Sequence, residues 1–480
     1  MNFNSIIFAI FMGIVFFIYW MISDQYRWMV VLLVSCCFYI GFGIFFFVLL
    51  GIVTVFSYLA GLAVGVKRNK RLCKIFFIVS IVSIICILAY FKYAAFIVQT
   101  VNSILKTAVI QSHPFIQKIA LPVGISFYSF KALSYIIDVY RGGNPETNLA
   151  KYAAYMFFFP EIASGPIDRV GSLLPQLTKT HKFSYKSVSY GLKLVAWGLF
   201  KKIIVADTLA FFVDWVYGSY ETFYGFALLL ASIFFTIQIY CDFSGYSDMA
   251  IGLARMLDIE IKENFRSPYF ATSIQEFWRR WHISLSTWFR DYLYIPLGGN
   301  RKGEARKRIN LLITFLISGL WHGASWTFVF WGGVHGTAQI LENVFTRLFS
   351  PQKNGCRWKQ CLKTILVFIF CNFAWIFFRA DTMEQAWYFI KHMFDGINHP
   401  VQYFAVAQQR LIIDVFLFGK ICIMLSEVFI FDLLNKQRDV IDLISKQGTI
   451  VRWSIYATFT FVIIAFLPIA PGTDFLYFQF

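Results

Sequence analysis

The stretch IFFIVSIVSIICILAYFKYAAF, residues Ile75–Phe96, is almost entirely apolar and has the length of a membrane span. About 20 residues, at 1.5 Å of rise each, cross the ~30 Å hydrocarbon core of a bilayer. Similar apolar runs recur along the chain, at Ile6–Met21, Phe45–Val66 and Phe223–Phe243, and at Phe461–Ala470 together with the residues upstream of it. The sequence therefore predicts an all-α protein, a polytopic bundle of transmembrane helices.

Composition and charge agree with this fold class. Of the 480 residues, 58% are hydrophobic and 14% are charged, whereas soluble domains average about 25% charged residues. The net charge of +17 comes largely from short basic loops between apolar runs, such as Lys67–Lys74 and Arg301–Arg308. This is the positive-inside pattern of membrane proteins. Because no solvated basic domain is present, the charge does not indicate a nucleic-acid partner.

Placing the basic loops in the cytoplasm predicts a multi-pass protein of a bacterial inner membrane, with residues 1–480 as a single membrane domain. We expect roughly 11–12 spans and assign residues 244–308 to the cytoplasmic side. The expected helices lie at about 5–22, 28–44, 45–66, 75–98, 119–138, 189–214, 222–243, 309–330, 331–348, 362–379, 409–432 and 452–470. Residues 152–171, which contain Pro160, Gly165 and Pro166, are expected to form a re-entrant element, which is tolerated only when buried in protein or lining a cavity.

The cysteines indicate neither a metal site nor a disulfide framework. Five of the nine lie inside apolar runs, where cysteine usually acts as a small hydrophobic residue. No Cys-x-x-Cys motif and no Cys/His cluster with metal-ligand spacing is present. We therefore predict no metal ion in this protein.

An amphipathic segment lies in the most polar region of the chain, residues 238–336. Ser273–Glu276 has the capping-box pattern and predicts the start of a helix over Ile274–Tyr292. At ~100° per residue, aromatic side chains share one face of this helix. The opposite face carries Arg279, Arg280, Arg290 and Asp291. A helix of this kind lies at the membrane surface. His282 falls at the edge of the apolar face, and the segment is equally typical of a simple interfacial anchor.

His322 is a candidate catalytic base. It is expected about 13 residues into a helix over Ile309–Phe330, or ~20 Å along its axis. An ionisable residue at such depth is costly and marks a functional-site hypothesis. Burial favours the neutral imidazole, which can accept a proton from a hydroxyl. The small neighbours are expected to leave room beside the ring; they are Ser318, Gly319, Gly323 and Ser325.

The residues alone also allow a structural role for His322. Small residues around an intramembrane histidine are typical of close helix packing, with the imidazole bonded to a neighbouring helix. For His335, which shares a helix with Gln339 and Glu342, a structural hydrogen bond is the favoured interpretation.

Two stretches carry a family resemblance. Phe277–Gly299 (FWRRWHISLSTWFRDYLYIPLGG) and Gly319–Ala324 (GLWHGA) resemble the signature of the membrane-bound O-acyltransferase family, most closely its alginate O-acetyltransferase branch. Further stretches resemble the same branch, namely Phe159–Pro166, Asp242–Asp248, Trp375–Ala380 and Tyr477–Phe480. The resemblance implies that His322 and His282 are the catalytic histidines and that 244–348 is the catalytic core segment. It also implies a central tunnel that joins a cytoplasmic acyl donor to an acceptor outside.

The resemblance further implies the substrates and partners. The donor would be acetyl-coenzyme A or an acyl-carrier thioester, with no permanently bound cofactor. Arg280 and Arg290 are then candidates to bind the phosphates of that donor. The product would be an O-acetylated extracellular or cell-wall polysaccharide, completed by an extracytoplasmic SGNH-type transferase or a polysaccharide biosynthesis complex.

Two alternative functions remain open from the sequence. The first is D-alanyl transfer to teichoic acid from a carrier protein, although Ile295–Asn300 and the basic loop 301–308 look more like the acetyltransferase branch. The second, from a different class, is a membrane transporter or polymer-export component. The sequence shows no internal repeat and no acidic relay within the helices, and both absences count against transport.

Overall fold

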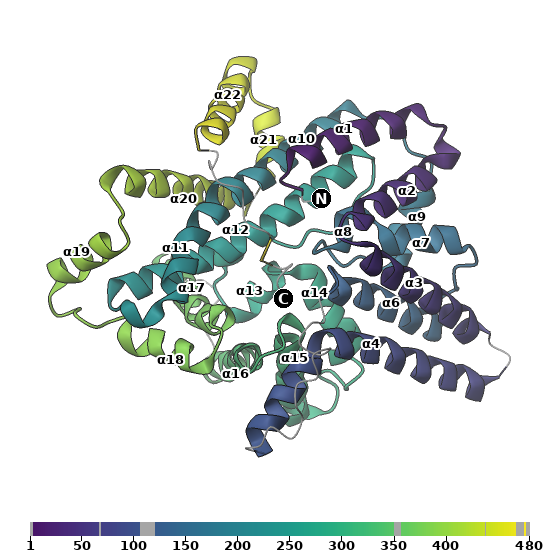
Figure 1. The fold of residues 1–480 in the computed structure, drawn as a ribbon, viewed down its shortest axis with the longest axis horizontal. Coiled ribbons are helices and arrows are strands. Elements are labelled where there is room, and N and C mark those ends of the chain that lie inside the picture. The colour runs from purple at the N-terminus through teal and green to yellow at the C-terminus, as the bar shows by residue number, and fades with distance from the viewer. Residues whose placement is uncertain are drawn as a thin grey trace. The chain divides into compact units, whose positions relative to one another are not determined.

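The computed structural model describes residues 3–66, 69–105, 121–349, 357–436, 438–466 and 475–476 (Figure 1). Over these ranges every regular element is helical, which confirms the predicted all-α class. Several sequence predictions fall outside the described residues. They concern Lys67 and Arg68, the beginning of the 119–138 helix, the last part of the 452–470 helix, and the terminal motif Tyr477–Phe480.

The chain forms two compact units. The first comprises Met1–Leu192 and Ala250–Lys262, and the second comprises Lys193–Met249 and Glu263–Phe480. The long helix α12, Phe226–Met256, supplies its first part to the second unit and its last turns to the first.

The first unit is built largely from apolar helices. They are α1 (Ile6–Met21), α2 (Arg27–Ile40), α3 (Ile44–Gly65), α4 (Lys70–Leu105) and α6 (Ile125–Tyr140). The first three begin and end within a few residues of the predicted limits, because each coincides with an apolar run. Helices α3, α4 and α6 pack side by side (Figure 1).

Residues 149–178 form a broken element in the first unit, as the proline and glycine residues predict. It consists of α7 (Leu149–Phe157), the single turn α8 (Phe159–Ile162) and α9 (Val170–Thr178). The nine residues of α7 cover only about 14 Å, too little to cross a bilayer. A buried ion pair between Lys131 Nζ and Glu161 Oε2, at 2.8 Å, joins α6 to α8.

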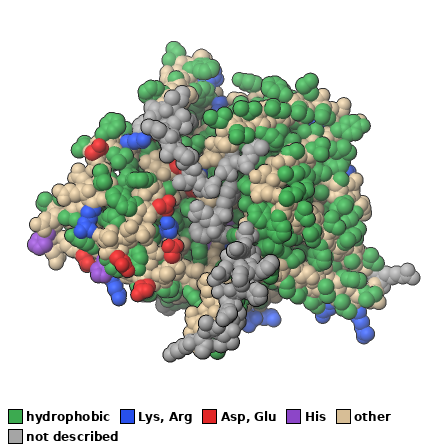
Figure 2. All heavy atoms as spheres, viewed as in Figure 1, with side chains coloured by type: hydrophobic (Ala, Val, Ile, Leu, Met, Phe, Trp, Pro, Cys, Tyr) green, Lys and Arg blue, Asp and Glu red, His purple; other side chains and the backbone are tan. Residues whose placement is uncertain are grey.

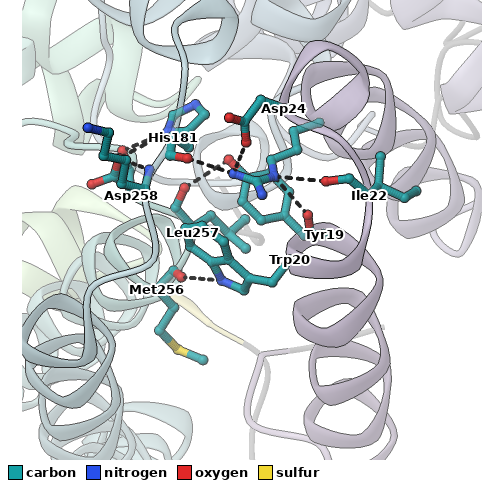
Figure 3. A network of polar contacts seen from close by, with 10 residues as sticks. Tyr19, Trp20, Ile22, Asp24, His181, Met256, Leu257 and Asp258 are labelled. Carbon is teal, nitrogen blue, oxygen red and sulfur yellow. Dashed lines mark hydrogen bonds and ion pairs between the residues drawn. The ribbon is translucent and has the colours of Figure 1, made fainter.

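A polar network around Arg27 holds three parts of the first unit together (Figure 3). The Arg27 guanidinium donates to the backbone carbonyls of Tyr19 and His181, at 3.1 and 2.7 Å. The Tyr19 hydroxyl donates to the carbonyl of Leu257 at 2.9 Å, and His181 Nδ1 lies 3.2 Å from the carbonyl oxygen of Asp258. Because such hydrogen bonds each contribute about 0.5–1.5 kcal/mol, they stabilise the contact of α1 and the 179–184 loop with the end of α12.

The second unit contains the remaining helices. Helix α10 (Tyr185–Leu199) begins in the first unit and continues through a π-helical turn (Phe200–Ala206) into α11 (Asp207–Gly218). Helix α12 is followed by α13 (Ile274–Arg280), α14 (Ile283–Phe289), α15 (Gly303–His322) and α16 (Trp326–Phe349). The later helices are α17 (Arg357–Arg379), α18 (Met383–His392), α19 (Pro400–Arg410), α20 (Val415–Asn435), α21 (Val440–Ser445) and α22 (Thr449–Phe466). Helices α18, α19 and α21 were not predicted, because they are too short to give the signal of a membrane span.

Four helices in the described part of the chain are long and apolar enough to cross a membrane, namely α3, α4, α12 and α17. In the first unit, large apolar side chains such as Ile75 and Val82 of α4 are about half exposed, and hydrophobic side chains cover the surface over α1 to α4 (Figure 2). Exposed apolar area of this extent fits contact with lipid. The larger count of roughly 11–12 spans and the central tunnel stay predictions.

Candidate active site

The two histidines selected from the sequence meet in the core of the second unit. The ring centroids of His282 and His322 lie 6.3 Å apart, with an angle of 58° between the ring planes. His282 is completely buried and His322 is 2% exposed. The fold therefore brings together two imidazoles that lie 40 residues apart in the sequence.

His282 lies at a break between two helices, and the prediction of one continuous helix over Ile274–Tyr292 is wrong. Helix α13 ends at Arg280 and α14 begins at Ile283. Between them, His282 adopts the left-handed conformation, with φ 43° and ψ 55°. This conformation costs a non-glycine residue about 1–2 kcal/mol. Residues that hold such strain cluster at functional sites.

The start of α13 is capped as its sequence predicts, with an additional partner from α16. Ser273 Oγ accepts a hydrogen bond from the backbone N–H of Glu276 at 2.9 Å. The carboxylate of Glu342 accepts from the N–H groups of Ile274 and Gln275, at 2.9 and 3.0 Å. Glu342 thereby fixes α13 against α16.

His322 is the last residue of α15, and the prediction of a single helix over Ile309–Phe330 is wrong. Gly323 is extended, with φ −155° and ψ 148°, and α16 begins at Trp326. Ser325 Oγ accepts a hydrogen bond from the N–H of Thr327 at 3.1 Å, which supports the new helix start. The end of α15 carries a partial negative charge that stabilises a nearby cation.

The glycines beside His322 serve helix packing, so the expectation that they leave room beside the ring is wrong for both. A Cβ atom on Gly319 would stand 2.2 Å from the carbonyl oxygen of Phe328, and one on Gly323 would stand 2.0 Å from the Phe328 ring. These contacts show that α15 and α16 approach closely because glycine has no side chain.

Aromatic rings enclose both histidines. The centroid of the His322 ring lies 4.9 Å from that of Trp321 and 5.1 Å from that of Trp331. The His282 ring lies 4.7 Å from the Phe243 ring and meets it edge-on, at 88°. Burial in these surroundings lowers the pKa of His282 to about 3, because the charged imidazolium is poorly solvated. His282 is therefore neutral at physiological pH.

His335 occupies the same aromatic core and has the hydrogen-bonding role expected for it. Its Nδ1 atom accepts a hydrogen bond from Trp278 Nε1 at 3.2 Å. It is completely buried, and its ring lies 5.0 Å from that of Trp331.

The two arginines predicted to bind the donor each have a carboxylate partner. Arg280 pairs with Glu276 at 2.6 Å, one turn earlier on α13. Arg290 pairs with its neighbour Asp291 at 2.8 Å, and its side chain is 61% exposed. An incoming phosphate would therefore compete with a carboxylate at both arginines.

A buried charge cluster was missed by the sequence analysis. Lys202 Nζ lies 2.7 Å from Asp242 and 2.9 Å from Asp207, and Lys201 Nζ lies 2.6 Å from Asp248. The available signal was the pair of adjacent lysines inside the apolar run 189–214, because charges in such runs are rare and usually paired. The motif Asp242–Asp248 is thus helical, in α12, and both of its aspartates bind these lysines.

These features occur in a chain of known family. The model of the membrane-bound O-acyltransferase family matches residues 74–380, more than half of the chain, and the chain belongs to this family of acyltransferases. It is 40% identical to the probable alginate O-acetylase AlgI of Pseudomonas aeruginosa over 404 residues, 82% of this chain and 75% of that protein.

Two other relatives differ in their named substrates. The peptidoglycan O-acetyltransferase of Helicobacter pylori is 34% identical over 77% of this chain and 74% of its own length. The teichoic acid D-alanyltransferase of Bacillus subtilis is 27% identical over 55% of this chain and 70% of its own length. The comparisons confirm the predicted family and enzyme class.

Proposed function

We propose that this chain moves an acetyl group from a cytoplasmic thioester across a bacterial inner membrane, toward hydroxyl groups of an extracellular or cell-wall polysaccharide. The observation that carries the proposal is the buried pair His282 and His322, 6.3 Å apart within aromatic walls. The names of the relatives that cover most of this chain support acetyl as the group and a carbohydrate polymer as the acceptor.

In the proposed mechanism His322 acts as the general base. Its neutral imidazole accepts the proton of the acceptor hydroxyl while the hydroxyl oxygen attacks the thioester carbonyl. The new C–O bond forms, the C–S bond breaks, and the leaving thiolate takes up the proton from His322. The partial negative charge at the end of α15 stabilises the transient imidazolium. His282, which is neutral, orients the thioester by a hydrogen bond.

The donor and the partner belong to the same proposal. Acetyl-coenzyme A is the simplest donor, and Arg280 and Arg290 would meet its phosphates. Arg290 is the better placed of the two, because its side chain is 61% exposed, whereas that of Arg280 is 18% exposed. An extracytoplasmic SGNH-type transferase would receive the acetyl group and complete its transfer to the polymer.

Product analysis tests the proposed function. Exopolysaccharide and cell wall are isolated from the parent strain, from a strain without this gene, and from strains that carry the wild-type or the His322→Ala gene. Acetate released by mild alkali should disappear on deletion and return only with the wild-type gene. Equal acetate content in all four strains would disprove acetyl transfer by this chain.

D-alanyl transfer is a second candidate, supported by the similarity to the Bacillus subtilis teichoic acid D-alanyltransferase. The same alkaline extracts distinguish the two functions, because they are assayed for D-alanine as well as acetate. If deletion of the gene removes D-alanine from the extracts and leaves acetate unchanged, the chain transfers D-alanine, and its donor is an aminoacyl carrier protein.

A further inference from the structure

Asn264, in the segment between α12 and α13, holds the backbone next to His282. Its carbonyl oxygen accepts a hydrogen bond from the N–H of Ile283 at 2.9 Å, and its Oδ1 atom accepts from the N–H of Ser284 at 3.2 Å. Its Nδ2 atom donates to Ser247 Oγ at 3.4 Å. Asn264 is itself completely buried. One side chain thus links α12 to the first turn of α14.

These contacts replace an ordinary helix cap. The first N–H groups of a helix have no partner within the helix, and the side chain of the N-cap residue usually accepts from one of them. The N-cap of α14 is His282, whose side chain makes no such bond. Asn264 satisfies the N–H groups of the first two residues of α14 instead. The imidazole of His282 therefore takes no part in capping.

The same contacts stabilise the strained turn. A left-handed conformation at a residue other than glycine persists only where the surroundings hold it. Asn264 binds the chain just after His282. The N–H of Arg266, two residues after Asn264, donates to the carbonyl of Arg280, which lies just before His282, at 3.0 Å. The segment 264–266 therefore fixes the chain on both sides of His282.

We propose that Asn264 is a positioning residue for acyl transfer, which acts by holding the backbone turn that places the His282 imidazole beside His322. This inference rests on the proposed catalytic role of His282. It assigns Asn264 no contact with either substrate.

A double-mutant cycle tests the inference in the full-length protein. The variants are Asn264→Ala, His282→Ala and the two combined, and the rate of acetate incorporation into polysaccharide is measured per folded molecule. A displacement of about 1 Å can lower a rate about 100-fold. We expect a loss of roughly 10–100-fold for Asn264→Ala, with little change in the donor KM, and no further loss when it is added to His282→Ala.

Three further variants serve as rescue and controls. Asn264→Asp keeps an acceptor for the N–H of Ser284 and should recover most of the activity. Ser247→Ala removes only the hydroxyl that holds the Asn264 amide, and gives a milder test if Asn264→Ala does not fold. Asn310→Ala is the matched control, because Asn310 is also buried and its Nδ2 donates to the carbonyl of Gly299 at 3.0 Å; its activity per folded molecule should be unchanged.

A second readout does not depend on activity. Diethyl pyrocarbonate modifies accessible imidazoles, and mass spectrometry of peptides from the purified chain gives the rate at His282. That rate should rise in Asn264→Ala and stay at the wild-type value in Asn310→Ala. An unchanged rate in Asn264→Ala would overturn the inference.

The outcomes separate the inference from the proposed function. Multiplicative losses in the cycle would show that Asn264 acts independently of His282, which overturns the inference and leaves the catalytic role of His282 intact. Wild-type activity of His282→Ala would overturn both the inference about Asn264 and the catalytic role of His282.

Discussion

His322 and His335 are two buried histidines of one aromatic core, and the proposed mechanism assigns catalysis to only one of them. His322→Ala should fold, because Trp321, Trp331 and Phe378 remain around it, yet lose at least the ~10²–10⁴-fold in rate typical of a missing general base. His335→Ala should retain its activity per folded molecule. It should instead lose about 1–3 kcal/mol of stability, because Trp278 Nε1 is left without its acceptor. Acetate incorporation measures the loss of rate, and thermal melting measures the loss of stability. If His335→Ala lost activity and His322→Ala kept it, His335 would be the catalytic residue and His322 the structural one.

The lowered pKa of His282 predicts an acid-sensitive fold. In the unfolded chain its imidazole titrates near pH 6.5, while burial lowers the pKa in the folded protein to about 3. The unfolded state therefore binds more protons between these values, and stability is lost as the pH falls from about 6.5 toward 3, by up to about 1.4 kcal/mol per unit. Melting temperatures at pH 7.5, 6.0 and 5.0 should fall less steeply for His282→Gln than for wild type. Parallel curves for the two proteins would contradict the buried neutral state.

At the scale of elements, the sequence predicts where helices exist better than where they end. The apolar runs located α1, α2 and α3 within a few residues, because burial in lipid depends on composition alone. The break at His282 could not be predicted, since Ile274–Tyr292 has a regular amphipathic pattern and the turn is held by Asn264, which lies earlier in the chain. The end of α15 had a weak local signal in Gly323. The two catalytic candidates, His282 and His322, were selected from motifs and not from helix limits, so the wrong limits did not affect their selection. The structure places the two rings 6.3 Å apart, and their catalytic role stays a prediction.

Close packing of α15 on α16 gives a prediction at this scale. In Gly319→Ala the new methyl group would meet the backbone oxygen of Phe328 at 2.2 Å, so the helices must separate, at a cost of about 1–3 kcal/mol. Because His322 ends α15, acetate incorporation per folded molecule should fall as well. The control is Gly333→Ala on α16, whose methyl group would contact only the Leu316 side chain, at 3.5 Å. Similar melting temperatures for the two variants would show that the helix contact is not tight.

For the whole molecule, charge distribution rather than packing determines orientation in the membrane. Basic loops remain in the cytoplasm because moving them across the membrane is unfavourable, so Asn69 and Gly303 should lie inside and Tyr220 outside. All three are placed in loops or at helix ends. In a variant whose nine native cysteines are replaced, a single cysteine at Tyr220 should react with a membrane-impermeant maleimide in intact cells. Cysteines at Asn69 and Gly303 should react only after the cells are opened. Asn69 serves as the control for leakage, because it lies in a different basic loop, outside the segment 244–308. Labelling of Gly303 in intact cells would place 244–308, and with it the start of α15, on the outer side. The thioester could then not approach from the cytoplasm, and the proposed direction of acyl transfer would be wrong.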